Sequence, residues 1–311
     1  MTKHHINILW RLKHLAEMNQ SPPTIDPRAA RRWQHMPAGQ SPWLHEEVAR
    51  RMEERLEWIK LQPVQWVHWA PVHGGLEAHT LLSRRYPDAG SFVFEVQADR
   101  YAYFSRATMT PWWRPSRWTA KPNRLGVPPD GASQMVWANM ALHMAEEPQA
   151  LIAQWHRALA VNGFLMFSCL GPDTLHELRG VYESMGWPAL SHDFTDMHDW
   201  GDMLAAAGFA EPVMDMERIT LTFETPERLL KELRGLGRNL HPKRFPGLRG
   251  RRWYAQLRDA IAKMPLQLTF EVIYGHAFKP VPRLNMRAET VLTLTEMRDA
   301  LSQRKTYPVD T

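Results

Sequence analysis

Residues 162–180, which read NGFLMFSCLGPDTLHELRG, constrain the fold of this chain more than any other stretch. The stretch opens with Asn-Gly, a tight-turn signal, and an almost wholly apolar run from Phe164 to Leu170 then ends at a Gly-Pro pair. A short apolar run bounded by such breakers is typical of a strand that is buried on both faces. Thr174 and Glu177 have the spacing of a capping box, which predicts that a helix begins there.

A helix is also expected immediately before this strand. Apolar residues recur at helical spacing within residues 148–160, at Leu151, Ile152, Trp155 and Leu159. A helix, a buried strand and a second helix in succession are typical of an open α/β sheet rather than a β-sandwich. A length of 311 residues fits one large domain of this class with additions, or two small domains.

The rest of the chain contains further strand and helix signals. Apolar runs and alternating patterns predict strands at residues 65–70, 91–97, 134–139, 219–223 and 266–274. Helical spacing and helix-start signals predict helices at residues 2–20, 25–36, 41–61, 74–86, 98–107 and 200–207, within 226–264, and at 288–304. Residues 110–130 are predicted to be irregular, with one further strand. Glu46–Arg50 and Glu47–Arg51 are expected to pair on the outer face of the helix at 41–61.

Composition argues against a membrane-spanning or disulfide-rich protein. Hydrophobic residues make up 44% of the sequence, and no apolar run approaches the ~20 residues that cross a bilayer. Cys169 is the only cysteine, so an internal disulfide is impossible, and a buried, unreactive thiol in a cytoplasmic protein is expected. The net charge of +5 permits an acidic partner, such as nucleic acid, a membrane surface or an acidic carrier protein, without choosing among them.

Three stretches of the chain share the pattern of a known enzyme family. They read LAVNGFLMFSCLGPDTLHELR, HDFTDMHDWGDMLAAAGFAEPVMDMERITLTF and LQLTFEVIYGHAFKP. The chain resembles class I S-adenosylmethionine-dependent methyltransferases, and is most similar to the malonyl-acyl-carrier-protein O-methyltransferases of biotin biosynthesis, over roughly residues 25–280. The resemblance implies a Rossmann-like α/β fold with a seven-stranded, mostly parallel sheet. Residues 1–61 would form N-terminal lid helices, residues 62–280 the methyltransferase-like domain, and residues 281–311 a helical tail.

The resemblance also implies a cofactor site. In this family the loops after the first strands bind S-adenosylmethionine, much as such loops bind dinucleotides in related α/β folds. On this sequence the corresponding positions are Trp69, Gly74, Gly75, Glu95 and Asn139. The cofactor's methyl group would pass to the free carboxylate of malonyl-acyl carrier protein. A carboxylate is already a nucleophile at neutral pH, so no catalytic base is expected.

The cofactor motif itself departs from the family pattern. The acidic position after the first strand is Trp69, which has no acceptor carboxylate, and the first two glycine positions are Pro71 and His73. After the second strand the acidic position is Val96, and Glu95, one residue earlier, is expected to face the opposite side of the strand. A second hypothesis is therefore a cofactor-free pseudo-methyltransferase that acts as a binding or regulatory module, with the indole of Trp69 filling part of the cofactor pocket.

A dense basic run lies between the last two predicted strands. Its members are Lys231, Arg234, Arg238, Lys243, Arg244, Arg249, Arg251 and Arg252. In the resembled family the substrate is carried on the phosphopantetheine of an acidic acyl carrier protein, which implies carrier contacts at Arg244, Arg249, Arg251 and Arg252. A solvated surface is an equally weighted alternative. Nucleic acid binding, with Trp253 and Tyr254 as stacking platforms, is the least favoured.

No metal site is expected. His68, His73 and His79 lie close together in the sequence but lack a recognised ligand spacing. The acidic, histidine-bearing segment at residues 192–202 is interpreted as structural, with Asp199 or a neighbour capping the helix at 200–207.

Overall fold

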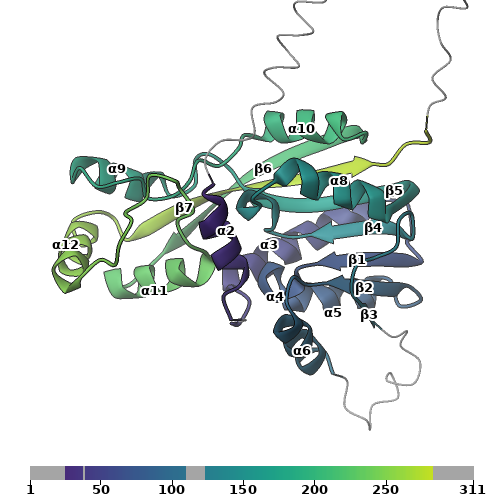
Figure 1. The fold of residues 1–311 in the computed structure, drawn as a ribbon, viewed down its shortest axis with the longest axis horizontal. Helices are drawn as coiled ribbons and strands as arrows, with labels where there is room; N and C mark the ends of the chain where they lie inside the picture. Colours follow the sequence, from purple (N-terminus) through teal and green to yellow (C-terminus); the bar gives the residue numbers. More distant parts are fainter. Residues whose placement is uncertain (1–24, 38, 110–122, 283–311) are drawn as a thin grey trace, which may run out of the picture. The chain divides into compact units, whose positions relative to one another are not determined.

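The computed structural model describes residues 25–37, 39–109 and 123–282 (Figure 1). The chain divides into two compact units, residues 1–280 and 281–311, and every described helix and strand belongs to the first. The helices expected at residues 2–20 and 288–304 lie outside the described residues.

The first unit is built on one seven-stranded sheet with the order β3-β2-β1-β4-β5-β7-β6. Strands β1 to β5 pair in parallel, and β7 runs antiparallel to both of its neighbours. The strands are β1 Gln65–Trp69, β2 Gly90–Phe94, β3 Asn123–Leu125, β4 Ser133–Ala138, β5 Leu159–Leu170, β6 Ala210–Thr222 and β7 Gln267–Phe278. The seven-stranded, mostly parallel α/β sheet is therefore confirmed, including a short strand within the irregular segment at 110–130.

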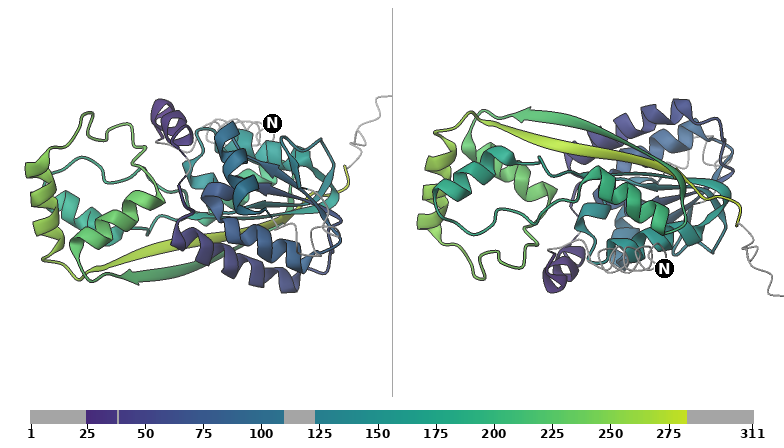
Figure 2. Two further views of the ribbon diagram at one scale, coloured as in Figure 1. Left: turned by 90° about the horizontal axis from the view of Figure 1, so that it is seen from below. Right: turned by 90° about the horizontal axis from the view of Figure 1, so that it is seen from above.

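Helices cover both faces of the sheet (Figure 2). The helices are α2 Pro27–Gln34, α3 Trp43–Glu54, η1 Arg55–Trp58, α4 Pro71–Gly74, α5 Leu76–Arg85, α6 Ala98–Ala107, η2 Leu142–Met144, α8 Pro148–Ala158, α9 His176–Ser184, α10 Met197–Ala206, α11 Pro226–Leu236 and α12 Arg251–Ile261. On one face, α3 and α5 bury Val48 and Leu82 against Trp66 of β1. On the other, α8 and α10 bury Ile152 and Leu204.

The antiparallel pair β6–β7 extends beyond the rest of the sheet and carries a cap of three helices (Figure 1). Only the second half of β7, from Val272 to Phe278, pairs with β5, whereas β6 pairs along β7 as far as Gln267. Helices α9, α11 and α12 pack around the extended part, with Leu229 and Leu257 in the same apolar cluster as Phe270. This agrees with the expectation that residues 226–264 form helices at one end of the sheet.

The predicted capping box is wrong, and the reason lies in β7. The side chain of Thr174 exchanges two hydrogen bonds with the backbone of Glu271, at 3.1 and 3.2 Å. Glu177 accepts from the backbone N–H and the hydroxyl of Thr269, at 3.1 and 2.7 Å. Because β5 ends at Leu170, these groups of β7 have no strand partner on that side, and a buried backbone group must find another. Thr174 and Glu177 therefore bond to β7 instead of capping the N-terminus of α9.

The predicted alternation also holds for only one of the two last strands. In β6, at the sheet edge, Ile219 is buried while Thr220 is exposed. In β7 the run from Leu268 to Gly275 is buried without alternation, because both faces of this strand are covered: Phe270 and Tyr274 pack in one apolar cluster and Ile273 in the other. Cys169 is buried on β5, and burial raises the pKa of its thiol. Among the described residues, no helix is long and apolar enough to cross a membrane.

Two glycines provide a matched test of this packing. A Cβ added to Gly275 of β7 would overlap the ring of its β5 partner Phe167, whereas a Cβ on Gly180 of α9 would meet no atom within 4 Å. We expect Gly275→Ala to lower the free energy of unfolding by about 1–3 kcal/mol through overpacking. We expect Gly180→Ala to raise it by up to about 1 kcal/mol through helix propensity. Urea denaturation measures both, and equal effects would contradict the described contact.

Candidate functional site

Five residues implied by the resemblance come together at the carboxyl ends of β1, β2 and β4. They are Trp69, Gly74, Gly75, Glu95 and Asn139. Gly74 and Gly75 belong to the turn Ala70–Gly75, which joins β1 to α5 and contains the single helical turn α4, and the other three residues lie next to it. In an open α/β sheet this edge is where ligands bind.

The backbone of the turn adopts two conformations that most residues avoid. Ala70 has a φ of +50°, in the left-handed region, and Gly75 has a φ of +119°, which favours glycine. The N–H of Ala70 donates to the carbonyl of Phe94 at 2.8 Å, so the turn stays attached to the end of β2. The turn therefore changes direction sharply after β1 and places Leu76 at the start of α5.

Asn139, which follows β4, joins the turn to the N-terminal helices. Its side-chain amide donates to the carbonyl of Gly74 and, at 2.8 Å, to that of His45 on α3. Its side-chain oxygen accepts from the hydroxyl of Ser168 at 2.5 Å. A Cβ on Gly74 would lie 2.5 Å from the backbone oxygen of Asn139. Close approach of the chain to itself is thus sufficient to require glycine at position 74.

Glu46 of α3 occupies the N-terminus of α5. Its two carboxylate oxygens accept from the backbone N–H groups of Leu76 and Glu77, at 2.8 and 3.1 Å. A Cβ on Gly75 would lie 3.1 Å from this carboxylate and 3.2 Å from Ala49. The predicted Glu46–Arg50 pair is therefore wrong. The amides that would attract an anionic ligand at a helix N-terminus contact a carboxylate of the chain itself.

His45 and Trp33 add a second set of contacts from the N-terminal helices to the turn. A ring nitrogen of His45 lies 2.8 Å from the carbonyl oxygen of His73. The rings of His45 and Trp33 each lie 4.9 Å from the ring of His73, in edge-to-face geometry. The predicted N-terminal helices thus lie directly against the turn, which their expected role as a lid would require.

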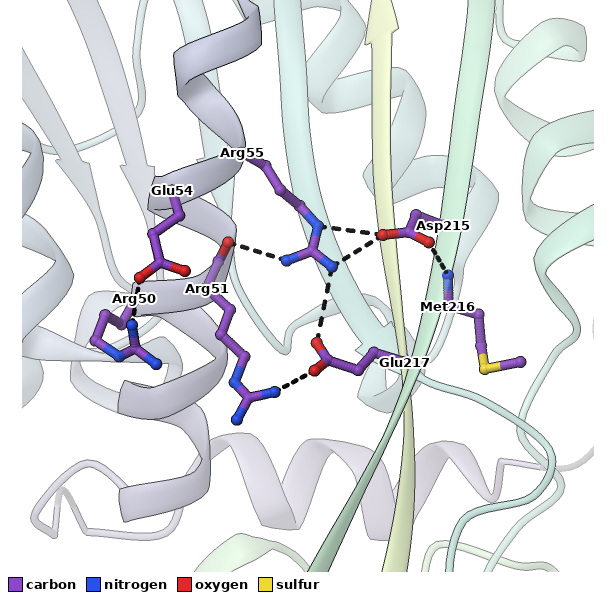
Figure 3. Close-up of a pocket in the computed structure, with 7 residues that line it drawn as sticks. All are labelled: Arg50, Arg51, Glu54, Arg55, Asp215, Met216 and Glu217. Atoms are coloured by element: carbon purple, nitrogen blue, oxygen red, sulfur yellow. Dashed lines mark hydrogen bonds and ion pairs between the residues drawn. The ribbon is translucent and has the colours of Figure 1, made fainter.

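The other end of α3 is joined to β6 by ion pairs, shown in Figure 3. Arg51 pairs with Glu217, and Arg55 pairs with Asp215 at 2.9 Å and stacks 3.8 Å above the ring of Tyr274. The paired arginines and carboxylates, without Tyr274, line a shallow cavity of about 390 Å³. Each arginine in the cavity already has a carboxylate partner. The cavity is therefore the place where ion pairs join α3 to β6, and it is not an anion-binding site.

Glu95 reaches the turn, so the prediction that it faces away is wrong. Strand β2 ends at Phe94, and the two-residue alternation of a strand no longer applies one residue later. One oxygen of Glu95 accepts from the N–H of Val72 at 2.8 Å, and the other lies 3.9 Å from Arg100. The side chain is buried, and burial raises the pKa of Glu95 to about 7.

Trp69 is buried in the layer between the sheet and α8. It is 5% exposed. Its ring stacks on Phe94 with centroids 4.0 Å apart and meets Trp155 of α8 edge-on at 6.1 Å. The indole is thus a core side chain, and the expected acid at this position is replaced by apolar packing.

The four arginines predicted to contact a carrier divide into two pairs. Arg244 donates to Asp26 at 2.7 Å, and Arg249 stacks over Trp253 at 4.1 Å, so both have partners within the chain. Arg251 and Arg252 are exposed at the start of α12. Only the second pair is fully presented to solvent.

Several of the remaining histidines, and the acid that caps α10, have structural partners. His68 and His79 stack in the core, with ring nitrogens 3.3 Å apart, and Asp196, not Asp199, caps α10. His192 lies 2.8 Å from the carbonyl oxygen of His143. Within the described residues, no group of three or more His, Cys, Asp or Glu side chains could hold a metal ion.

The buried histidines should make stability depend on pH. Burial lowers the pKa of both His45 and His79 to about 4, against about 6.5 in an unfolded chain. Between these values the unfolded chain binds protons that the folded protein does not, so the free energy of unfolding falls as the pH falls. The raised pKa of Glu95 has the opposite effect, because its contribution to stability is lost as the pH rises from about 4.5 to about 7.

Urea denaturation of wild type and His79→Gln at pH 7 and pH 5 isolates one of these terms. On acidification from pH 7 to pH 5, we expect the free energy of unfolding of the wild type to fall by about 1–2 kcal/mol more than that of His79→Gln. His35→Gln, which alters an exposed side chain at the end of α2 with no acidic partner among the described residues, is the control and should behave as wild type. An identical pH dependence in all three proteins would show that His79 is not buried in its neutral form.

Comparison with known proteins places this geometry in a family. No protein-family model matches the chain. A malonyl-[acyl-carrier protein] O-methyltransferase of Gallionella capsiferriformans is 36% identical over 262 residues, which cover 80% of this chain and 88% of that protein. The enzyme of the same name from Laribacter hongkongensis is 36% identical over 252 residues, covering 77% of this chain and 84% of that protein.

Solved structures agree on the fold. A protein of Bacillus halodurans classed with the methyltransferases matches with a TM-score of 0.50 and 14% identity, over 76% of this chain and 100% of that chain. The YcgJ protein of Bacillus subtilis matches with a TM-score of 0.50 and 11% identity, over 76% and 99% of the two chains. At 36% identity over four-fifths of its length, this chain belongs to the malonyl-[acyl-carrier protein] O-methyltransferase family, within the class I S-adenosylmethionine-dependent methyltransferases.

Proposed function

We propose that this protein binds an acyl carrier protein without binding S-adenosylmethionine. The observation that carries the proposal is the carboxylate of Glu46 on the N-terminal amides of α5. That contact brings α3 over the turn at which the family's cofactor would lie. The protein would then be a binding or regulatory module built on an enzyme fold, a use that fold alone neither requires nor excludes.

The residues at the turn do not fit the family's cofactor. Trp69 replaces an acid and packs in the core, and Pro71 removes a backbone donor. Glu95 and Asn139 are polar, yet both form hydrogen bonds within the chain. Each missing charged hydrogen bond would weaken binding by roughly 1.5–3 kcal/mol, so the loss of two or three lowers the affinity by orders of magnitude.

The carrier-binding half of the proposal is supported by exposed basic residues on the helical cap that α9, α11 and α12 form, called the basic cap below. Lys231 and Arg234 are exposed on α11, and Arg251 and Arg252 are exposed on α12. The relatives are malonyl-[acyl-carrier protein] O-methyltransferases, enzymes named for a carrier-protein substrate. The family resemblance implies an acidic carrier, which such a surface suits by complementary charge.

An active methyltransferase is the second candidate, and the turn contains the observation that favours it. Gly75 leaves the backbone of the turn without a side chain on the side that α3 covers, as a bound cofactor would need. In that case α3 must withdraw and break the contacts of Glu46, His45 and Arg51. The two candidates therefore differ in whether α3 leaves the turn.

Calorimetric titration distinguishes the two candidates. We expect no heat from wild type with S-adenosylmethionine up to millimolar concentration. A second titration with holo-acyl carrier protein should give binding that weakens steeply with salt, because the contacts are ionic. Arg251→Glu/Arg252→Glu should abolish it, whereas Arg32→Glu/Arg157→Glu, a charge-matched control elsewhere on the surface, should not. Micromolar binding of S-adenosylmethionine to wild type would contradict the proposal.

The role of Trp69 gives a separate prediction. Trp69→Ala removes a large aromatic ring from the core and should lower the free energy of unfolding by about 3–5 kcal/mol. Thermal unfolding of wild type and variant, with and without S-adenosylmethionine, measures this. We expect a large stability loss and no stabilisation by the ligand in either protein. A small loss with ligand-dependent stabilisation would indicate an open, functional cofactor pocket.

A further inference from the structure

The loop between α11 and α12 carries the most exposed large apolar side chain in the described part of the chain. Leu248 is 100% exposed, and Phe245, in the same loop, is 43% exposed. We call residues 245–248 the loop tip. The loop belongs to the basic cap, on the extension of β6 and β7 (Figure 1). Single exposed apolar side chains are normal, but two in one loop tip favour a contact with an apolar partner.

The chain is anchored on both sides of the loop tip. Before the tip, Arg244 donates to Asp26 at 2.7 Å. After it, the guanidinium of Arg249 lies 4.1 Å from the ring centre of Trp253 and 4.6 Å from that of Phe245. A guanidinium over aromatic rings is held by attraction between its charge and the ring faces. These contacts fix the base of the loop and leave its tip exposed.

Positive charge surrounds the loop tip. Residues 241–258 contain no Asp or Glu. Three cations in this segment are exposed and form no ion pair with another described residue: Lys243, Arg251 and Arg252. Helix α9, which packs against α12, adds one exposed acid, Glu183. Apolar surface and excess positive charge are therefore combined at one place on the basic cap.

We propose that the loop tip inserts into the surface of a membrane that contains anionic lipids. An apolar side chain gains free energy when it leaves water for the boundary of the acyl chains, and nearby Lys and Arg side chains are attracted to anionic headgroups. A protein partner would need a pocket shaped for the tip, whereas a fluid lipid layer does not. Arg251 and Arg252 also belong to the surface proposed for the carrier, so membrane and carrier would compete for them.

Co-sedimentation of the whole protein with lipid vesicles tests this inference. The probes are vesicles of phosphatidylcholine alone and vesicles of phosphatidylcholine mixed with the anionic lipid phosphatidylglycerol. We expect the protein to sediment with the anionic vesicles at low salt, to be released as salt is added, and not to sediment with the neutral vesicles. A protein that sediments with neither kind would overturn the inference. Carrier binding, which is measured separately by calorimetry, would not be affected by that result.

A matched pair of substitutions assigns the contact to the loop tip. Leu248→Ser changes a fully exposed side chain and should weaken binding to anionic vesicles by about tenfold. Val127→Ser is the control, because Val127 is 66% exposed and follows β3, at the edge of the sheet opposite to β6. It should bind as wild type does.

Two outcomes with these variants would contradict the insertion. Equal vesicle binding by wild type and both variants would mean that charge alone holds the protein to the lipid. A loss of carrier affinity in Leu248→Ser, with vesicle binding unchanged, would assign the loop tip to the carrier instead.

Discussion

The contact between the carboxylate of Glu46 and the first amides of α5 is the interaction on which the arrangement of the site depends. A carboxylate at a helix N-terminus gains from charge-assisted hydrogen bonds and from the helix dipole. Burial raises the pKa of Glu46, but those amides and Ser41 favour its charged form. An anionic ligand would compete for the same amides. It could displace α3 only if it bound the form of the protein without these α3 contacts tightly enough to offset their loss.

Other contacts hold both ends of α3 in this same position. His45 is bonded to His73 and, through its carbonyl, to Asn139 at the end of β4. At the far end, Arg51 and Arg55 connect the helix to β6. Exposed ion pairs contribute little individually, but several that restrain one helix share the entropic cost of ordering it. Withdrawal of α3 would break contacts at both ends together.

At this turn, residue types that would bind a cofactor in the family instead form hydrogen bonds within the chain. Glu95 supports the turn through Val72, and Asn139 supports it through Gly74. Buried polar groups need partners, and each of these side chains has one within the chain, although the second oxygen of Glu95 has no hydrogen-bond partner among the described residues. The basic cap is carried on the β6–β7 extension, away from this turn, so its surface can retain a binding role independently of the turn (Figure 1).

The sequence by itself determined the sheet, the buried fifth strand, the burial of Cys169 and the position of the candidate turn. The buried strand and the burial of Cys169 follow from local patterns of apolar residues and breakers, whereas the seven strands of the sheet and the position of the turn were expected from the resemblance to a family. Only the tertiary structure decided the partners of single polar side chains. Glu46 bonds to α5 rather than to Arg50, Thr174 and Glu177 bond to β7 rather than capping α9, and Arg244 bonds to Asp26. These partners lie far away in the sequence, and a carboxylate or hydroxyl accepts any suitably placed donor, so the fold had to bring each pair together before the choice was made.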